Sequence, residues 1–363
     1  MHRITTSIIE TQTKFDQRDS MFSQAASGAA DHPLIRRWIE DEAPDPLIRA
    51  LMGIPRERNS VLHYLISATD GPLNPEPVPV DNTRALTEKI KALARYFGAD
   101  LVGVCPLNQN YVVSNRGDEY SFGTAEWGRP VELNHRFAIS LGFKRNFEMV
   151  KAGHSYIDGN DGAMTYNRAA YAACLLGGYI RELGYSAKVH FERVEEVLQV
   201  PVAVEAGLGE LGRLGILITP DYGPRVRLAT VTTDIPLERD RPIDIGVQKF
   251  CRICRKCAFC CPSGAISKGD QKILRGAQKW VIHPEKCLAF WGSDKTKHED
   301  CSNCVAVCPY NRSDIWLNRA HHRPVFFKAL KNPFFGRLML WVDHLIRGRN
   351  PHPSVRWLDY SNE

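Results

Sequence analysis

The chain has 363 residues, of which 44% are hydrophobic and 24% are charged, as in a soluble globular protein with one large domain or two ordinary ones. The net charge of +6 allows an acidic partner or an anionic substrate but requires neither. The N-terminus has no apolar segment of a signal peptide, and no stretch approaches about eighteen apolar residues, which favours a cytoplasmic protein over an exported or membrane-spanning one.

The first 82 residues predict an irregular extension with short helical pieces. Within it, GPLNPEPVPVDN is rich in proline, which favours a linker or a strap over the surface. A helix follows, which Thr83 can cap and Gly98 can end. Its apolar positions recur at helical spacing: Leu86, Ile90, Leu93, Ala94 and Phe97.

Strands and a second long helix follow up to residue 247. ADLVGVCPL is a continuous apolar run, typical of a strand buried on both faces, and HRFAISLGF predicts another strand. MTYNRAAYAACLLGGYIREL predicts a helix closed by Gly184, while SAKVHF and VPVAVEAG are strand-like. GRLGILITPDYGPRVRLATVTTD predicts two strands joined by a turn at Pro220-Asp221-Tyr222-Gly223. Residues 83–247 therefore predict a mixed α/β core of the layered sandwich type.

Two cysteine runs occupy residues 248–317. The first, Cys-x2-Cys-x2-Cys-x3-Cys-Pro, is the run of bacterial ferredoxins and consists of Cys251, Cys254, Cys257 and Cys261. The second lacks one cysteine, which an upstream residue can replace; its members are Cys287, Cys301, Cys304 and Cys308. Cysteines this close in sequence favour a metal cluster over disulfides. Three ligands at this spacing followed by Cys-Pro are not typical of a zinc site. The runs therefore predict a ferredoxin-like module with two [4Fe-4S] clusters.

The ligands can be divided between the clusters, because in two-cluster ferredoxins the fourth cysteine of each run ligates the other cluster. One cluster then takes Cys251, Cys254, Cys257 and Cys308. The other takes Cys261, Cys287, Cys301 and Cys304. Three cysteines are left over, and we expect them to be small buried hydrophobic residues: Cys105, Cys174 and Cys260.

The tail, residues 318–363, is both basic and apolar. It carries eight Lys or Arg residues against three acids, and FFKALKNPFFGRLMLWVDHLIRG within it predicts a helical segment rich in Phe, Leu and Trp. We expect this extension to pack on the core. A membrane, a second subunit of a homodimer, or a tRNA or lipid surface are the alternatives.

About 250 residues precede the clusters, which implies an acceptor site for their electrons. No G-x-G-x-x-G occurs in a dinucleotide-binding context, because the glycines of GLGELGRLG do not have its spacing. A Rossmann cofactor is therefore not predicted.

A resemblance to a known family indicates what the acceptor is. PVAVEAGLGELGRLGILITPDYGPRVRLATVTTDIPL, running into CRICRKCAFCCPSGAIS and on to CSNCVAVCPYNR, resembles the corrinoid- and iron–sulfur-dependent reductive dehalogenases. The resemblance extends back through YNRAAYAACLLGGYIRELGYSA and to FDQRDSMFSQA, so it covers most of the chain. The related epoxyqueuosine reductases share the fold and both clusters. They are less similar at GPRVRL and usually end in a helical-repeat domain that has no obvious counterpart here.

The resemblance implies a nitroreductase-like α/β core that holds cobalamin in the base-off form, with the ferredoxin-like module beside it. The sequence has no Asp-x-His-x-x-Gly cobalamin signature, in agreement with this mode of binding. The cofactor would be held mainly by backbone and shape. The substrate implied is a small organohalide, with no nucleic acid.

The resemblance also implies a tyrosine proton donor with a basic residue beside it. Alignment on YNRAAYAACLLGGYI places the donor at Tyr166, with Tyr156 and Tyr171 as alternatives. GPRVRL supplies Arg225 and Arg227, of which we favour Arg227. A cation beside a phenol favours the phenolate and makes the phenol a better acid, and a positive group also favours the departing halide.

The sequence departs from some relatives in two respects. Some members carry an Asn between the tyrosine and the arginine, but HFERVEEVLQVP contains none, so that role is vacant or differently filled. The chain also lacks the fused flavin and plant-type ferredoxin module of the self-sufficient enzymes, which implies a separate electron donor such as a ferredoxin or flavodoxin.

Two other functions compete with reductive dehalogenation. The first is epoxide reduction on tRNA by an epoxyqueuosine reductase, which the basic tail would suit. The second is non-enzymatic, an electron-transfer or corrinoid-carrying protein, and it predicts no turnover of any organohalide.

Overall fold

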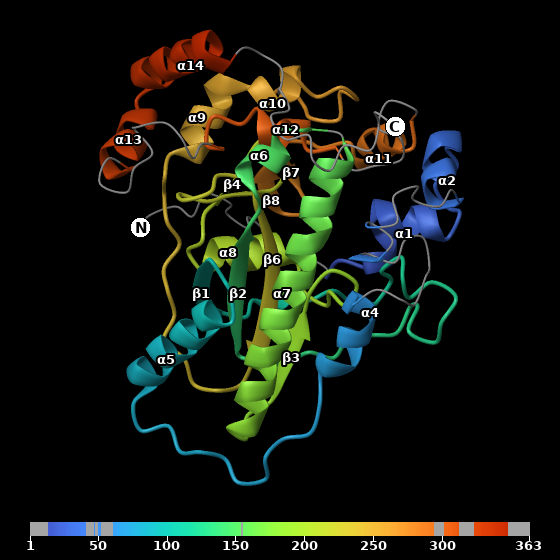
Figure 1. Ribbon diagram of the computed structural model, residues 1–363, viewed down its shortest axis with the longest axis vertical. Helices are drawn as coiled ribbons and strands as arrows, with labels where there is room; N and C mark the ends of the chain where they lie inside the picture. The colour runs from blue at the N-terminus through green and yellow to red at the C-terminus, as the bar shows by residue number, and fades with distance from the viewer. Residues whose placement is uncertain are drawn as a thin grey trace.

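The computed structural model describes residues 14–40, 47, 50–51, 61–153, 155–293, 301–311 and 323–347 (Figure 1). At its centre is a four-stranded sheet in the order β1-β2-β6-β3, in which every neighbouring pair is antiparallel. The strands are β1 (Leu101–Pro106), β2 (Phe137–Lys144), β3 (Ala187–His190) and β6 (Val226–Thr233). Most residues of β2 and β6 are buried, because helices cover both faces of the sheet.

Helices lie on the two faces of the sheet. The long helix α7 (Tyr156–Glu182) packs across β6, β3 and β2 in front of the sheet in Figure 1, and α8 (Gln199–Glu205) lies behind it. The face of α7 toward the sheet is rich in small side chains, all fully buried: Ala169, Ala170, Ala172 and Ala173. Alanines favour the helix and let its backbone approach the strands closely. Helix α5 (Thr83–Tyr96) packs beside α7 and β1. These layers confirm the predicted mixed α/β core.

Most predicted elements of the core are present, with differences at three places. Helix α5 is capped by Asn82 rather than Thr83. Helix α7 begins earlier than MTYNRAAY indicates, after the cap Ser155. VPVAVEAG was expected to be strand-like but forms α8, where Val202, Ala203 and Val204 are all buried. A short helix buried on most sides shows no helical periodicity, so the valines dominate its sequence pattern.

The turn predicted at Pro220–Gly223 is also present, with reciprocal backbone hydrogen bonds between Thr219 and Gly223. Its flanking strands, however, belong to different sheets. β5 (Leu217–Ile218) pairs with β4 (Glu210–Leu211), while β6 enters the central sheet.

The N-terminal extension packs on other parts of the chain. Its helical pieces are η1 (Gln17–Asp19), α1 (Met21–Ala26), α2 (Pro33–Glu40), α4 (Val61–Leu65) and η2 (Ile66–Ala68). The proline-rich segment runs over the surface as predicted, and Asn74 and Val78 donate backbone hydrogen bonds to Arg181 and Leu183 at the end of α7. A 3-10 turn, η3 (Gln109–Tyr111), follows β1.

A second core belongs to the cysteine-rich segment. Helix α6 (Phe147–Val150) lies beside this segment. The elements of the segment itself are α9 (Val247–Cys254), α10 (Lys256–Phe259), the hairpin of β7 (Lys272–Leu274) and β8 (Ala277–Lys279), α11 (Pro284–Trp291) and α12 (Asn303–Ala306). Helix α2 of the N-terminal extension packs against α11 through Ile35 and Leu288. The ferredoxin-like module therefore lies above the sheet and packs around a hydrophobic cluster to which Val150, Leu214 and Ile218 also contribute (Figure 1).

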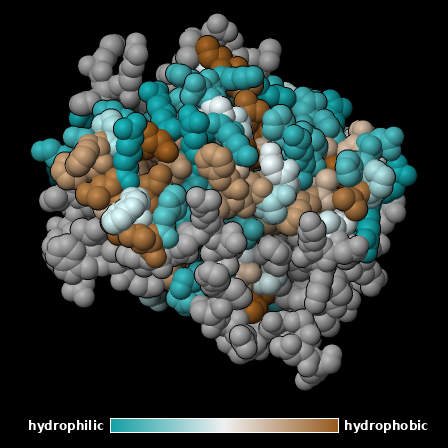
Figure 2. Space-filling view, turned by 90° about the horizontal axis from the view of Figure 1, so that it is seen from above, coloured by the Kyte–Doolittle hydropathy of each residue, from teal (hydrophilic) through white to brown (hydrophobic). Residues whose placement is uncertain are grey.

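The described part of the C-terminal extension packs on this module. Helices α13 (Arg323–Leu330) and α14 (Pro333–Arg347) contact α9, and Lys256 Nζ lies 2.7 Å from Asp343 Oδ2 in a buried ion pair. Figure 2 views the molecule from this end and shows apolar side chains among hydrophilic ones. The exposed apolar residues of α14 are Phe334, Phe335, Leu338, Trp341 and Leu345. No helix in the described part of the chain is both long and apolar enough to cross a membrane.

A buried histidine makes the stability of the core depend on pH. His190 is fully buried, with Nε2 3.0 Å from Thr232 Oγ1, and its Nδ1 accepts from the backbone N–H of Glu196. Burial, with smaller effects of Lys188 and His135, lowers the pKa of His190 to about 3. In the unfolded chain the ring binds a proton near its usual pKa of about 6.5, so acid favours unfolding below that pH.

We therefore expect the contribution of His190 to stability to be complete above about pH 6.5 and to be lost as the pH falls toward 3. Between pH 7 and pH 5 the loss should be roughly 2 kcal/mol of unfolding free energy. Urea unfolding of the wild type and His190→Gln at the two pH values measures it, because all other titrating groups are common to both. An equal pH dependence in the two proteins would contradict the assignment.

Candidate functional site

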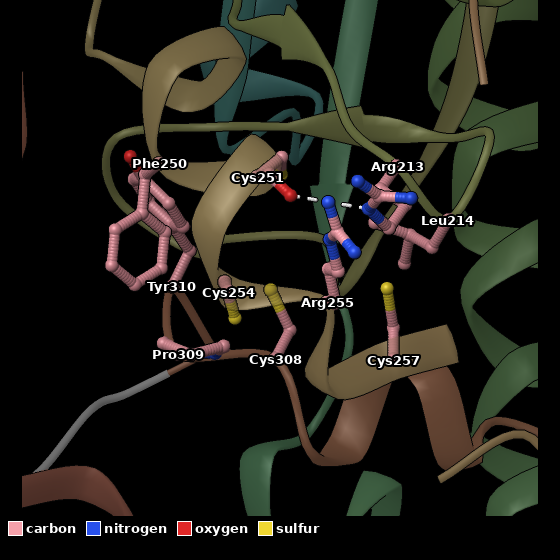
Figure 3. A pocket seen from close by; sticks show the side chains of 10 residues that line it. All are labelled: Arg213, Leu214, Phe250, Cys251, Cys254, Arg255, Cys257, Cys308, Pro309 and Tyr310. Carbon is pink, nitrogen blue, oxygen red and sulfur yellow. Dashed lines mark hydrogen bonds between the residues drawn. The ribbon is translucent and has the colours of Figure 1, made fainter. Parts of the chain in front are cut away.

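Four cysteines of the two runs line one cavity (Figure 3). Cys251 and Cys254 belong to α9, Cys257 belongs to α10, and Cys308 comes from the second run, after α12. Arg255, between α9 and α10, has a φ of 50°, and this left-handed residue turns the chain so that the second helix brings Cys257 to the cavity. The structure thus brings together the four residues that the sequence groups as ligands of one cluster.

Cys251, Cys257 and Cys308 are buried and Cys254 is partly buried. Burial is unfavourable for thiolates without a positive partner. Burial raises the pKa of Cys251 to about 11, and burial followed by neighbouring thiols raises those of Cys254 and Cys257 further. In the described part of the chain no three His, Cys, Asp or Glu side chains meet closely enough to hold a single metal ion. An iron–sulfur cluster instead spreads its four thiolate ligands over several irons and supplies the positive charge. The donor set and its burial fit such a cluster.

Arg213 is a fixed cation at the wall of this cavity (Figure 3). Its guanidinium donates to three backbone carbonyls: that of Cys251 at 3.1 Å, Ser267 at 2.7 Å and Gly269 at 2.8 Å. It also lies 4.8 Å from the centre of the Trp280 ring. A buried cation held this firmly favours the more negative state of a neighbouring cluster.

The other predicted ligands are partly buried: Cys261, Cys287, Cys301 and Cys304. Burial would raise the pKa of Cys261, but hydrogen bonds from Ser263 and from the backbone of Ala265 and Ile266 lower it, so this thiol is prepared for the thiolate form. The assignment of the four cysteines Cys261, Cys287, Cys301 and Cys304 to a second cluster remains a prediction. Cys105 and Cys174 are buried in apolar surroundings as expected, whereas Cys260 is only partly buried.

A second group of polar residues surrounds Tyr166 on α7, toward the sheet. The guanidinium carbon of Arg227, on β6, lies 4.5 Å from the centre of the Tyr166 ring. Gly162, one turn earlier on α7, makes room for this arginine, because a Cβ there would lie 3.1 Å from Arg227 Nη2. Burial raises the pKa of Glu192, which follows β3, and the nearby guanidinium of Arg227 opposes that rise. Three elements therefore bring a phenol, a guanidinium and a carboxylate together.

The other predicted candidates occupy different positions. Arg225 donates to the carbonyl of Arg145 at 2.7 Å and lies over the rings of Phe147 and Tyr222. Tyr171 is 56% exposed on α7. The side chain of Tyr156 lies outside the described residues. This geometry favours Arg227 over Arg225 as the neighbour of Tyr166, and the catalytic role of either remains a prediction.

Arg145 connects the α/β core to the cysteine-rich segment. It is buried, forms ion pairs with Asp158 and Asp161 of α7 at 2.7 and 3.0 Å, and donates to Ser302 Oγ at 3.0 Å. Ser302 lies between two predicted cluster ligands, Cys301 and Cys304. The helix that carries Tyr166 and the second cysteine run are thus joined through one buried side chain.

Two further glutamates lie near Glu192. Burial, followed by the repulsion of Glu192, raises the pKa of Glu119 and that of Glu195 to about 8. Burial also raises the pKa of Glu192 itself, against the opposing effects of Arg227 and Arg193. Arg193 has a φ of 94° and lies 4.0 Å over the ring of Tyr120. Its Nε and Nη2 atoms are buried and have no hydrogen-bond partner among the described residues.

No motif in the sequence points to five residues of these two groups: Glu192, Glu119, Glu195, Arg193 and Arg213. One signal was available: HFERVEEV places charged residues beside Phe191 and Val194, which are buried. Charged side chains in an otherwise buried stretch are costly unless they have a partner or a function. The partners themselves come from elements distant in sequence, so the pattern could not name them.

Comparisons with known proteins give matches to the cysteine-rich segment and to most of the chain. Residues 250–312 match the 4Fe-4S dicluster domain family. The tetrachloroethene reductive dehalogenase of Sulfurospirillum multivorans is 33% identical over 75% of this chain and 58% of its own length. An epoxyqueuosine reductase of Listeria monocytogenes is 33% identical over only 32% of this chain.

Solved structures show the same relationship. The catabolic reductive dehalogenase NpRdhA superposes with a TM-score of 0.81 at 27% identity, covering 95% of this chain and 48% of that one. A reductive dehalogenase whose structure suggests a mechanism for B12-dependent dehalogenation gives a TM-score of 0.79 at 26% identity, covering 93% and 47%. The chain spans about half the length of the structures and of several curated relatives that it matches.

Proposed function

We propose that this chain, which is related to the reductive dehalogenases in sequence and in fold, removes halide from a small organohalide. The reaction takes two electrons and one proton, so that a carbon–hydrogen bond replaces the carbon–halogen bond and halide leaves. The observation that carries the proposal is the Tyr166–Arg227 pair, which offers a proton donor and a cation beside it. This pair lies in an α/β core joined to a cysteine-rich module that can bring electrons.

The cofactors of the proposal are two [4Fe-4S] clusters and a corrinoid. The match to a dicluster domain and the four-cysteine cavity support the clusters. The related structure described for B12-dependent dehalogenation supports the corrinoid, which when bound supplies a strongly reducing cobalt centre. The charged residues around Tyr166, with buried unpartnered nitrogens on Arg193, fit a large polar ligand. We infer the base-off form from the resemblance to the reductive dehalogenases, and the lack of an Asp-x-His-x-x-Gly motif agrees with it.

The residues of the chain then have separate roles. Tyr166 holds the proton at its hydroxyl and delivers it to the carbon that loses halide. Arg227, over the ring, favours the phenolate that remains after proton transfer and attracts the departing anion. Arg213 holds positive charge beside the cluster cavity. A separate protein donor delivers electrons to the clusters.

A spectrum and an assay of the reconstituted protein test this function. We expect anaerobically purified protein, loaded with cobalamin and iron, to show a corrinoid band above the iron–sulfur shoulder. Once reduced, it should release bromide from a bromophenol and leave an epoxyqueuosine-containing tRNA unchanged. Reduction of the tRNA instead would favour the epoxyqueuosine reductase function. Cofactor binding with no turnover of either substrate would favour an electron-transfer or corrinoid-carrying protein.

A further inference from the structure

Arg213 has a buried nitrogen beside the cavity of Cys251, Cys254, Cys257 and Cys308. Its side chain is 1% exposed, and its Nη2 atom has no hydrogen-bond partner in the described part of the chain. We propose that Nη2 donates a hydrogen bond to a sulfur atom of the iron–sulfur cluster held by these cysteines, and that Arg213 makes this cluster easier to reduce. The inference deepens the proposed function and rests on it, because it concerns one of the two proposed clusters.

The loop that carries Arg213 is fixed against the helix that carries the first cysteines. This loop joins β4 to β5, which pair with each other. Glu210 of β4 accepts hydrogen bonds at 2.6 and 3.1 Å from two backbone N–H groups at and just before the start of α9. Gln248 of α9 donates to the carbonyl of Leu211 at 2.6 Å. The backbone of Arg213 therefore has a defined position relative to α9.

Three hydrogen bonds then orient the guanidinium of Arg213. Its Nε donates to the carbonyl of Cys251, and its Nη1 donates to the carbonyls of Ser267 and Gly269. The ring of Trp280 lies against the same group, 4.8 Å from it. A guanidinium is planar and rigid, so bonds from Nε and Nη1 also determine where Nη2 lies. Figure 3 shows this group among the cysteine side chains, and cluster sulfurs in that cavity are acceptors that can satisfy the buried donor.

Burial and pairing distinguish Arg213 from other cations near the cavity. The three acceptors of Arg213 are neutral carbonyls, which leave its positive charge in place. Lys256 is also buried, but its ion pair with Asp343 at 2.7 Å compensates its charge. Arg255 lines the cavity and is partly exposed, so water screens its charge more strongly. Arg213 therefore has the largest expected electrostatic effect of these three residues on the cluster.

The step that Arg213 affects is the transfer of one electron. The electron passes from the separate protein donor of the proposed function to the cluster, and no covalent bond forms or breaks. The reduced cluster carries one more negative charge, which a fixed cation and an N–H hydrogen bond to sulfur both stabilise. Arg213 keeps all its protons, because a guanidinium is not deprotonated in proteins. The predicted consequence is a higher reduction potential for this cluster.

The variant Arg213→Gln tests the inference, because it removes the positive charge. At a fixed applied potential the ratio of reduced to oxidised cluster should fall about tenfold, which is about 59 mV for a one-electron couple. A redox titration of the reconstituted protein, followed by electron paramagnetic resonance, measures this ratio, and one of the two clusters should shift while the other does not. Arg213→Lys keeps the charge and should change the ratio by less than about threefold.

A matched control is available on α9. Arg252 is next to Cys251 in sequence but is exposed, so Arg252→Gln removes the same charge from a position that water and salt screen. This control should change the ratio by less than about twofold. An unchanged ratio in Arg213→Gln with full iron content would overturn the inference, as would an equal change in Arg213→Gln and Arg252→Gln.

A second measurement examines the hydrogen bond in the wild type and decides the matter if Arg213→Gln loses iron. Reduced protein that contains ¹⁵N-labelled arginine should show a nitrogen coupling to the cluster in pulsed electron paramagnetic resonance. Arg255→Asn should keep this coupling, and asparagine tolerates the left-handed backbone at that position. Absence of the coupling in the wild type, or its loss in Arg255→Asn with the cluster intact, would overturn the inference.

Neither measurement uses an organohalide, so the inference and the proposed function can fail separately. A wild type with both expected results that releases no halide from any substrate would refute the proposed function and support the role of Arg213. Normal halide release with an unchanged cluster potential in Arg213→Gln would support the function and refute that role. A wild type that binds no iron after reconstitution would refute both.

Discussion

Replacing Tyr166 by phenylalanine should lower halide release by about a hundredfold or more, the usual scale for loss of a general acid. Both clusters and the corrinoid should remain, because the substitution removes one hydroxyl from a ring that packs against the core and lies under Arg227. The measurement is halide release by prereduced enzyme, with iron and corrinoid content determined on the same sample. The first turnover of prereduced enzyme should be lost together with the later ones, because the proton donor itself is absent.

Variants on the same helix and strand supply the controls. Tyr171→Phe removes a hydroxyl from an exposed tyrosine of α7 and should leave the rate within about twofold. Arg227→Gln should lower the rate less than Tyr166→Phe and shift its pH profile, because the phenol loses its cationic neighbour. Arg225→Gln should keep the pH profile, since Arg225 hydrogen-bonds to the backbone of Arg145. Near-normal dehalogenation by Tyr166→Phe with intact cofactors would make Tyr156 the next candidate.

Replacing Cys308 by alanine should remove one cluster and abolish turnover with an external electron donor. Two [4Fe-4S] clusters give about eight iron atoms per chain, so the iron content should fall by about half. The physical reason is that Cys308, from the second run, lines the same cavity as Cys251, Cys254 and Cys257. Iron analysis and the electron paramagnetic resonance spectrum of the reduced protein measure the loss.

Double variants show which cysteines share a cluster. Adding Cys251→Ala to Cys308→Ala should cost little more iron, because both residues line one cavity. Adding Cys287→Ala should remove most of the remaining iron, since Cys287 is predicted to belong to the other cluster. Cys260→Ala is the control and should retain the full iron content. Equal iron loss from Cys260→Ala and Cys308→Ala would refute the ligand assignment.

Buried polar contacts join the surroundings of Tyr166 to the cysteine-rich segment. Arg145 links α7, which carries Tyr166, to Ser302 in the second cysteine run. The buried Lys256–Asp343 pair ties the first run to α14. Loss of a cluster can therefore disturb the surroundings of Tyr166, whereas Tyr166→Phe leaves both ion pairs intact. Measuring the iron and corrinoid content of every sample distinguishes the loss of a cluster from the loss of the Tyr166 hydroxyl.

The sequence by itself determined the features whose residues lie close together in the chain. Cluster ligands follow one another at fixed spacing, so the runs from Cys251 to Cys261 and from Cys301 to Cys308 could be recognised directly. Continuous apolar segments indicated β1 and β2, and helical spacing indicated α5, because these patterns reflect local geometry. The prediction that Tyr166 pairs with Arg227 rested on the resemblance to a family and not on the spacing of these residues in the sequence.

Only the tertiary structure decided which distant residues meet. Arg227 belongs to a strand, yet it lies over the ring of Tyr166, a helix residue 61 positions earlier, because α7 packs on β6. Arg213 reaches the cluster cavity from a loop, where carbonyls of three residues hold it. The helix α8 replaced an expected strand because burial on most of its sides hides the helical period. Such contacts depend on how elements distant in sequence pack together. The free-energy cost of burying a charged side chain can be judged only when its partner is known.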